Sequence, residues 1–319
     1  MVKPQHNAML IASVAAVIAS WFTGSGFAAS LCIWLALNML LAASFRFVLL
    51  IGELNFALAG FVGIGAYAAG ASSTLLGWPF GVALAVAALG AGAFGLAGAF
   101  VTLRAKGPYF MLISFAFTEA IRLIYTQIPQ IGGSSGMVGI FPPDFLTRHY
   151  PMFVVIVVVL LLWALYAIEK SDFGKVLVAI RNNDSIVEAV GINVHMAKVL
   201  CVGISSGIAG ICGALLANAN NVISPGDFSF LLAVYTLAAV KLGGDSHILG
   251  AVIGAAVLTA LAQVALSFGP YEHIFYGAAI VIAVLAMPNG LVGIIKWAAG
   301  ALRKKSAPLQ AAKGSSYGH

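Results

Sequence analysis

Charged residues are scarce in this sequence of 319 residues. Lys and Arg number 16 and Asp and Glu 10, so 8% of the chain is charged, whereas a soluble domain has roughly a quarter. The hydrophobic share is 61% and the mean hydropathy is +1.03. Such a chain cannot cover a water-facing surface. This excludes a soluble globular enzyme, a protein that reads nucleic acid, and a disordered protein.

Residues for metal, disulfide and nucleotide chemistry are also few. The three cysteines, Cys32, Cys201 and Cys212, lie in apolar stretches without a C-x-x-C pair, and the six histidines show no metal-ligand spacing. No G-x-x-x-x-G-K-S/T motif occurs, so we expect no ATP hydrolysis by the P-loop route. Paired carboxylates and nucleophile–base sets are missing as well. We therefore expect a protein that is not an enzyme and binds no metal or cofactor itself.

Long apolar stretches take up most of the chain. A helix needs about 20 apolar residues to cross a bilayer. Charges and turn residues delimit ten candidates, at 8–23, 27–46, 56–76, 80–102, 109–128, 151–168, 198–219, 228–241, 248–268 and 273–295. The first also fits a signal peptide, although we favour an uncleaved span, and the eighth is short enough to be broken or tilted. The prediction is an all-α membrane protein of about ten helices over 1–295, followed by a basic, disordered tail over 296–319.

The positive charges orient this topology. With the N-terminus inside, the cytoplasmic side receives Lys3, Arg46, Arg104, Lys106, Lys170, Lys175, Arg181, Lys198, Lys241, Lys296, Arg303, Lys304, Lys305 and Lys313. Only Arg148 falls outside, and Arg122 lies within a span. This bias follows the positive-inside rule and predicts a multi-pass protein with both termini in the cytoplasm. The basic tail is expected to lie beside anionic lipid, and the net charge of +6 does not indicate nucleic acid.

Small residues recur at the spacing of packed membrane helices. Gly203, Gly207, Gly210 and Gly213 form one series, and a G-x-x-x-G pair follows at Gly250 and Gly254. Small residues let helix backbones approach closely in lipid. We interpret these glycines as packing positions of a helix bundle.

One predicted span carries two opposite charges. Glu119 and Arg122 are three residues apart and therefore lie on one helical face. Ionisable groups at mid-membrane depth are costly and often functional. Two interpretations stay open: a structural salt bridge, which we favour, and a proton-carrying pair of an autonomous secondary transporter.

The cytoplasmic segment 169–197 has the character of a partner-binding element. Ser185 and Glu188 have capping-box spacing, Asp184 is an equally good N-cap, and Gly191 is placed to end the helix. The short helix would offer an apolar set of Ile186, Val187 and Val190. Docking in a partner's groove would use that set, whereas a solvated loop would not need it.

The order of motifs resembles the permease subunits of branched-chain amino acid ABC importers of the LivM type, over almost the whole chain. The stretches that carry the resemblance are Gly60-Phe61 with Gly65-Ala66-Tyr67, Lys106-Gly107-Pro108-Tyr109-Phe110 leading to Glu119, Gly132-Gly133-Ser134-Ser135-Gly136, Ser171 to Asn193 with Gly191-Ile192-Asn193, and Ser224-Pro225 followed by Lys241-Leu242-Gly243-Gly244 and Gly250. Each stretch is weak alone, but their order and spacing are specific.

The resemblance implies partners and sites. A second homologous permease subunit would complete the pathway, two cytoplasmic ATPase subunits would use ATP, and an external solute-binding protein would deliver the cargo across the inner membrane of the cell. The segment that couples to the ATPases would contain Arg181, Asn182, Asp184, Ser185, Ile186, Val187, Glu188, Val190 and Gly191. The loop of Gly132, Gly133, Ser134 and Gly136 would lie where the binding protein docks.

Polar residues near helix breaks are the candidates for the solute path. They are Asn55, Ser114, Thr118, Glu119 and Ser224, because unsatisfied polar groups and broken helices in lipid tend to line cavities. The alternative is that each bonds a carbonyl group of a neighbouring helix. Departures from the family pattern, such as Glu53-Leu54-Asn55 and Ile131, leave the cargo open between branched-chain amino acids and urea, amides or other small polar solutes.

Overall fold

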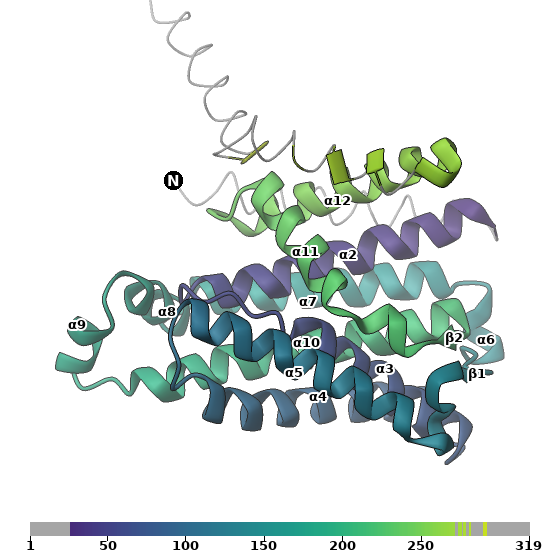
Figure 1. Cartoon of the computed structure of the whole chain (residues 1–319), viewed down its shortest axis with the longest axis horizontal. Coiled ribbons are helices and arrows are strands. Elements are labelled where there is room, and N and C mark those ends of the chain that lie inside the picture. The colour runs from purple at the N-terminus through teal and green to yellow at the C-terminus, as the bar shows by residue number, and fades with distance from the viewer. Residues whose placement is uncertain (1–25, 272–273, 276, 279–280, 282–289, 292–319) are drawn as a thin grey trace, which may run out of the picture.

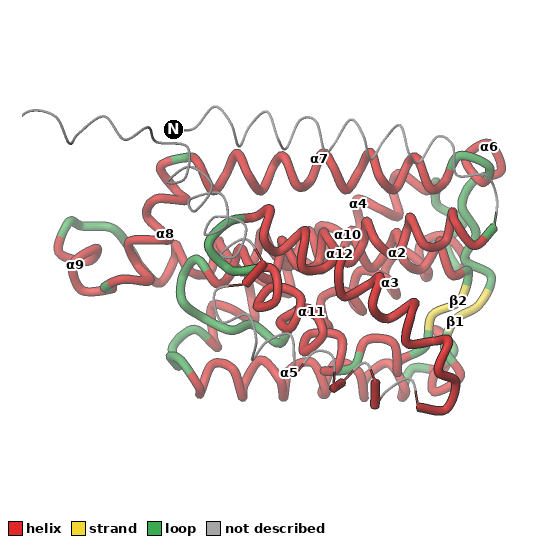
Figure 2. Tube along the Cα trace, turned by 90° about the horizontal axis from the view of Figure 1, so that it is seen from above, coloured by secondary structure: helices red, strands yellow, loops and turns green. Residues whose placement is uncertain are grey.

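The computed structural model describes residues 26–271, 274–275, 277–278, 281 and 290–291. Long helices run side by side along one axis of the molecule (Figure 1). They are α2 (Phe27–Leu49), α3 (Leu58–Thr74), α4 (Phe80–Thr102), α5 (Pro108–Gln127), α7 (Tyr150–Lys170), α10 (Val194–Asn220), α11 (Phe230–Gly243) and α12 (Ile248–Ala265). The shorter elements lie at the two ends of this bundle (Figure 2).

The predicted spans are helices wherever the structure describes them. Six of the described helices are long and apolar enough to cross a membrane: α2, α4, α5, α7, α10 and α12. The helix α3 has 17 residues and α11 has 14, and the shortness of α11 agrees with the prediction for 228–241. The predicted total of about ten spans is not confirmed. The candidate at 8–23, most of 273–295 and the tail over 296–319 lie outside the described residues.

Helix α10 forms the centre of the bundle and contacts α2, α3, α4 and α7. Its glycines make this close packing possible. A Cβ atom added at Gly210 would lie 2.5 Å from the carbonyl oxygen of Ala87 on α4, and one at Gly213 would collide with the carbonyl of Val62 on α3. The prediction that these glycines are packing positions is confirmed. Such contacts replace the hydrophobic drive that lipid does not provide.

The two ends of the bundle differ in structure and charge. One end carries α8 (Asp172–Asn182) and α9 (Asp184–Ala189), which together form the α8–α9 hairpin between α7 and α10. The other end carries α6 (Asp144–Thr147), short 3₁₀ turns, and an antiparallel pair of β1 (Met137–Val138) with β2 (Val222–Ile223). The Lys and Arg residues at the hairpin end are Arg46, Arg104, Lys106, Lys170, Lys175, Arg181, Lys198 and Lys241.

The chain between α2 and α3 is not helical. Residues 52–57 connect the two helices at the hairpin end, and Asn55, Phe56 and Ala57 are buried there. Gly52 has a φ of +82° and faces Arg181 of α8, whose Cγ would lie 3.3 Å from an added Cβ. This connection, called the 52–57 loop below, therefore lies between the hairpin and the helices of the bundle.

Candidate functional site

The α8–α9 hairpin projects from the bundle as two short helices in sequence (Figures 1 and 2). The sequence predicted one short helix near Asp184 in the segment 169–197, and the structure contains that helix as α9. Helix α8 precedes it, beginning directly after α7. Gly174 lets α8 pack close against the end of α7, since a Cβ at position 174 would collide with the carbonyl of Glu169.

The N-terminal cap of α9 differs from the prediction. Asn183 is the N-cap, and its side-chain oxygen accepts hydrogen bonds from the backbone N–H groups of Ser185 at 3.0 Å and Ile186 at 3.3 Å. The predicted caps were wrong: the carboxylate of Asp184 is bound by two lysines, and Ser185 and Glu188 lie inside the helix that Asn183 caps. The predicted stop is confirmed: α9 ends at Ala189, and Gly191 has a φ of +87°.

The apolar residues of α9 divide into a buried one and an exposed pair. Val187 is buried against the bundle. Ile186 is 64% exposed and Val190 is 76% exposed. Of the predicted apolar set, Ile186 and Val190 therefore form the surface available to another protein, while Val187 fixes α9 to its own chain. Arg181, Asn182, Ser185, Glu188 and Gly191 are also exposed.

Ion pairs hold the base of the hairpin. The guanidinium of Arg46 on α2 binds both carboxylate oxygens of Glu169 on α7, at 2.7 and 3.0 Å, and donates to the carbonyl of Asp245 at 2.9 Å. Arg46 is buried. The Asp245 carboxylate lies 3.8 Å from Arg181 and 3.5 Å from Lys241. Charge thus joins α2, α7, α8 and the turn between α11 and α12.

A second cluster lies beneath α9. Asp184 receives hydrogen bonds from Lys106 at 2.8 Å and Lys198 at 3.1 Å. Burial opposes ionisation of Asp184, but the two lysines outweigh it and hold the pKa of its carboxyl below the usual value. The ammonium of Lys198 also lies 3.9 Å from Glu53. Burial raises the pKa of Glu53, against the opposing effects of Lys198 and of the Gly107 N–H.

Three predicted path residues meet at the 52–57 loop. The Ser114 hydroxyl accepts from the N–H of Phe56 at 3.1 Å and donates to the Met111 carbonyl, while Thr118 donates to the carbonyl of Phe56 at 2.8 Å. Asn55 accepts from the N–H of Ala57, and its amide nitrogen has no partner among the described residues. Hydroxyl groups of α5 therefore satisfy the backbone of this break, as buried non-helical backbone requires.

A cavity of about 10 Å³ lies beside Asn55 and Ser114, with Phe110 and Phe117 among its other walls. That volume is enough for about one water molecule and far too small for an amino acid. In this conformation the space beside Asn55 and Ser114 therefore cannot hold a solute.

Glu119 and Arg122 form the predicted ion pair. Arg122 Nε lies 2.7 Å from Glu119 Oε2, and the two side chains are 31% and 27% exposed. The other oxygen of Glu119 accepts from the backbone N–H of Phe230 at 3.3 Å. Glu119 therefore joins α5 to the N-terminus of α11, where the helix dipole favours a negative charge.

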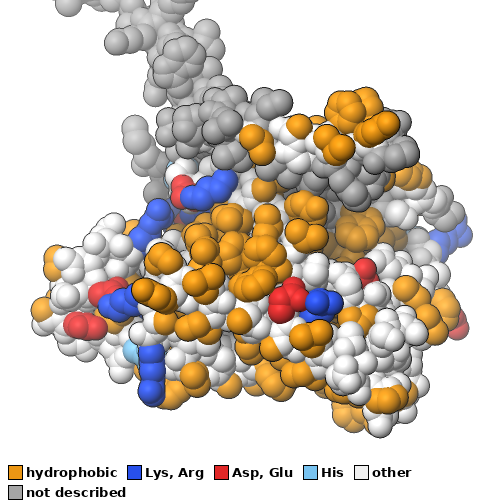
Figure 3. Space-filling view, viewed as in Figure 1, with side chains coloured by type: hydrophobic (Ala, Val, Ile, Leu, Met, Phe, Trp, Pro, Cys, Tyr) orange, Lys and Arg blue, Asp and Glu red, His pale blue; other side chains and the backbone are white. Residues whose placement is uncertain are grey.

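The surface around α5 is largely apolar. The exposed side chains of α5 include Leu112, Ile113, Phe115, Leu123 and Ile124. Figure 3 shows acidic and basic side chains together within this hydrophobic face. Charges at mid-membrane depth avoid lipid and face protein or water. This face, called the α5 face below, therefore combines exposed apolar side chains with the Glu119–Arg122 ion pair.

The remaining predicted residues lie at the opposite end of the bundle. Ser224 is an N-cap of the 3₁₀ helix η3 (Pro225–Phe228), where it forms a capping box with Asp227. Gly132, Gly133 and Gly136 all have positive φ values, and Ser134 lies in the 3₁₀ helix η2 (Gly133–Ser135). A Cβ at Gly136 would collide with the carbonyl of Ile223. Glycine thus lets the loop close against β2.

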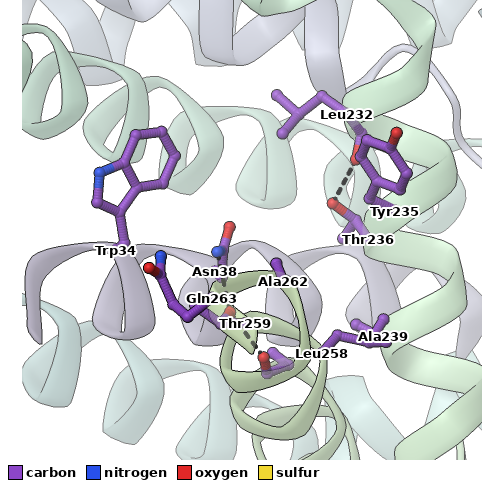
Figure 4. Close-up of a pocket in the computed structure, with 11 residues that line it drawn as sticks. Trp34, Asn38, Leu232, Tyr235, Thr236, Ala239, Leu258, Thr259, Ala262 and Gln263 are labelled. Carbon is purple, nitrogen blue, oxygen red and sulfur yellow. Dashed lines mark hydrogen bonds between the residues drawn. The ribbon is translucent and has the colours of Figure 1, made fainter. Parts of the chain in front are cut away.

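A larger cavity opens between α2, α11 and α12. Its volume is about 230 Å³, and its walls carry neutral polar groups, with no charged side chain among the residues that line it. Asn38 donates to the Thr259 hydroxyl at 3.0 Å. Figure 4 shows Trp34, Gln263, Tyr235 and Thr236 arranged around the same space. These residues were not predicted as a site, because single Asn, Thr and Gln residues in apolar spans form no motif.

The proximity of Glu53 and Lys198 was not predicted from the sequence. From the sequence, Glu53 is only a departure from the family pattern and Lys198 only a positive charge on the cytoplasmic side. A usable signal was present, since a carboxylate in a break between two spans and a lysine in the first turn of another span both need a partner. Their pairing depends on the three-dimensional fold and has no local spacing.

Comparisons with a family model and with known proteins agree on one family. Residues 27–284 match the family described as branched-chain amino acid transport system / permease component. The high-affinity branched-chain amino acid transport system permease protein LivM of Escherichia coli is 25% identical over 263 residues, which is 73% of this chain and 62% of LivM. The match thus spans less than two thirds of that relative.

Two further similarities are more limited. A probable branched-chain amino acid transport permease protein LivH of Methanocaldococcus jannaschii is 35% identical over 104 residues, or 32% of each chain. Among solved structures, PsaBC from Streptococcus pneumoniae in complex with Fab aligns with a TM-score of 0.43 and 18% identity, covering 86% of this chain and 93% of that one.

Proposed function

Because this chain belongs to the family of branched-chain amino acid transport system permease components, we propose that it is the membrane-spanning subunit of an ATP-driven, binding-protein-dependent importer. It is a multi-pass membrane protein whose relatives are permeases. The cargo that we propose is a branched-chain or related amino acid. Urea, an amide or another small polar solute is the alternative cargo.

The α8–α9 hairpin is the observation that carries this proposal. It lies at the end of the bundle rich in Lys and Arg, which we assign to the cytoplasm. Its exposed pair, Ile186 and Val190, offers an apolar surface on a short helix, which suits a groove in another protein. We assign that groove to the ATPase subunits, since this chain carries no P-loop motif of its own.

The α5 face supports a second permease subunit as partner. An ion pair that is about 30% exposed on an otherwise apolar helix is costly against hydrocarbon. A second permease would cover this face and leave a polar path between the subunits. Movement of the hairpin with the ATPases would switch the path between its two sides.

The glycine loop at the opposite end is the proposed contact with the solute-binding protein. It would lie outside the cell, with the membrane in between and both chain termini in the cytoplasm. The loop is fixed to β2 by Gly136, so it presents a defined surface rather than a free strand of chain. ATP would be used by the partner subunits alone.

Association with the ATPases tests the proposal. The double variant Ile186→Asp and Val190→Asp places two charges on the exposed pair of α9 without touching buried Val187. We expect it to lose co-purification with the ATPase subunits of the same transporter while the chain stays in the membrane. Val138→Asp is the matched control, since Val138 is 68% exposed at the other end and its change should leave association intact. Undiminished association of the double variant would contradict the proposal.

The second candidate function is an autonomous secondary transporter, which the Glu119–Arg122 pair favours. A proton carrier must take up and release its proton during the cycle. Glu119 is held by Arg122 and by the Phe230 N–H at the same time, so its two oxygens are already engaged. The pair therefore suits a structural tie between α5 and α11 better than a proton relay.

A further inference from the structure

Lys198 occupies a position between the hairpin and the 52–57 loop. Its side chain is 6% exposed, and its ammonium lies 3.1 Å from Asp184 of α9 and 3.9 Å from Glu53 of the loop. These two carboxylates come from segments 131 positions apart in the sequence. A buried ammonium needs its charged partners, because an unpaired charge is strongly disfavoured away from water.

Both carboxylates also bind the turn that precedes α5. Asp184 accepts from the ammonium of Lys106 at 2.8 Å, and Glu53 accepts from the backbone N–H of Gly107 at 3.0 Å. The start of α5 is thus linked to α9 through Lys106 and to the 52–57 loop through Gly107. Asp184, Lys198 and Glu53 are called the charge relay below.

The relay continues through the 52–57 loop to α5. Glu53 is two positions from Asn55 and three from Phe56, and the Phe56 backbone is bound by Ser114 and Thr118 of α5. A displacement of α9 moves the carboxylate of Asp184. Because Lys198 is buried and cannot exchange that partner for water, its ammonium and the Glu53 carboxylate must rearrange together with the loop.

We propose that Lys198 is a positioning residue that couples the hairpin to the 52–57 loop and so to α5, whose Ser114 and Thr118 bind the backbone of that loop. This inference rests on the proposed function, since it supplies the path by which ATPase movement reaches the solute path. Lys198 itself touches neither ATP nor solute. Its replacement should separate ATP use from transport rather than abolish assembly.

The first test needs no cargo. Hydrogen exchange of peptides covering residues 52–57 and 103–110 is compared between the wild-type chain in nanodiscs and Asp184→Asn. The relay predicts exchange about fivefold faster in the variant, because one anchor of Lys198 and Lys106 is weakened. Asp172→Asn is the matched control: it removes the exposed partner of Lys175 on the same hairpin and should leave both peptides unchanged. Equal exchange in wild type and Asp184→Asn, or equal acceleration in Asp172→Asn, overturns the proposal.

The second test measures coupling in the complete importer with radiolabelled leucine as the probe. Lys198→Met should keep the ATPase subunits bound and hydrolysing ATP, but transport about tenfold less leucine per ATP. Lys198→Arg keeps the charge, and its ratio of leucine transported to ATP hydrolysed should lie within about twofold of wild type. An unchanged ratio in Lys198→Met, or a loss in Lys198→Arg as large as in Lys198→Met, overturns the relay.

The two tests separate the relay from the proposed function. If the wild-type importer moves no leucine, the proposed amino acid cargo fails, and the exchange experiment still decides on the relay. If Lys198→Met does not fold, as shown by gel filtration of the purified chain, Glu53→Gln replaces it. That variant removes the other charged partner of Lys198 and should give the same loss of leucine per ATP.

Discussion

The guanidinium of Arg46 and the carboxylate of Glu169 form a bidentate ion pair, with N–O distances of 2.7 and 3.0 Å, although the two residues are 123 positions apart. Arg46 is 2% exposed and Glu169 is 15% exposed. Such paired geometry suits arginine, whose planar group presents two donors side by side. The pair fixes the last turn of α2 to the point where α7 gives way to the hairpin.

Arg46→Leu should lower the free energy of unfolding by about 3–5 kcal/mol, because it leaves the Glu169 carboxylate without its buried partner. Equilibrium unfolding in mixed micelles with increasing SDS measures the change. Lys175→Met is the control, since it removes an exposed pair of the same hairpin and should leave the unfolding midpoint in place. Equal stability of Arg46→Leu and wild type would show that the pair is dispensable.

Gly65→Ala should destabilise the bundle by about 1–3 kcal/mol through overpacking. Gly65 on α3 faces Gly210 on α10, and an added Cβ would collide with the Gly210 carbonyl. Gly90→Ala on α4 is the matched control, because nothing lies within 4 Å of a Cβ there. The same SDS titration compares them. A Gly65→Ala variant as stable as Gly90→Ala would contradict the close approach of α3 and α10.

The pH dependence of the hairpin should follow Asp184. Its folded pKa lies below the usual value, so its stabilising contribution is present above the unfolded pKa of about 3.9 and is lost as the pH falls through the lower, folded value. Hydrogen-exchange protection of α9, corrected for intrinsic rates, should therefore persist from neutral pH down to about 4 and decline below it. Asp184→Asn should lack this acid step. A loss of protection already near neutral pH would mean that another group controls the hairpin.

Arg122→Gln should lower stability by about 2.5–3.5 kcal/mol, because it leaves a carboxylate without its cation within the membrane. The double variant Glu119→Gln and Arg122→Gln should be less affected than Arg122→Gln alone. The amide oxygen at position 119 of the double variant can still accept from the Phe230 N–H, and no charge is left unpaired. A double-mutant cycle on unfolding free energies measures this non-additivity. Additive losses would show that the two side chains do not interact.

The sequence was sufficient for features with a local cause. Apolar stretches predicted each described long helix, and the i, i+3 spacing predicted the Glu119–Arg122 pair. Gly191 marked the end of α9 because its backbone conformation favours glycine. The residue preferences for helix N-caps predicted the wrong cap for α9. Asp184 is as good a cap as Asn183 by itself, but Lys106, 78 positions away, binds its carboxylate.

Features with a long-range cause needed the structure. Arg46–Glu169 and Lys198–Glu53 join charges with no common motif. The burial of Val187 beside exposed Ile186 and Val190 depends on how α9 packs on the bundle. The family resemblance implied the role of the hairpin, but only the folded structure shows which of its residues remain exposed for a partner.

ATP-dependent uptake in proteoliposomes tests the central claim most directly. Vesicles containing this chain, its ATPase and permease partners and the binding protein are compared with vesicles that contain this chain alone, using radiolabelled leucine. The importer account predicts uptake that requires ATP and the complete set of subunits, with none by the chain alone under imposed proton or sodium gradients. Gradient-driven uptake by the chain alone would contradict it.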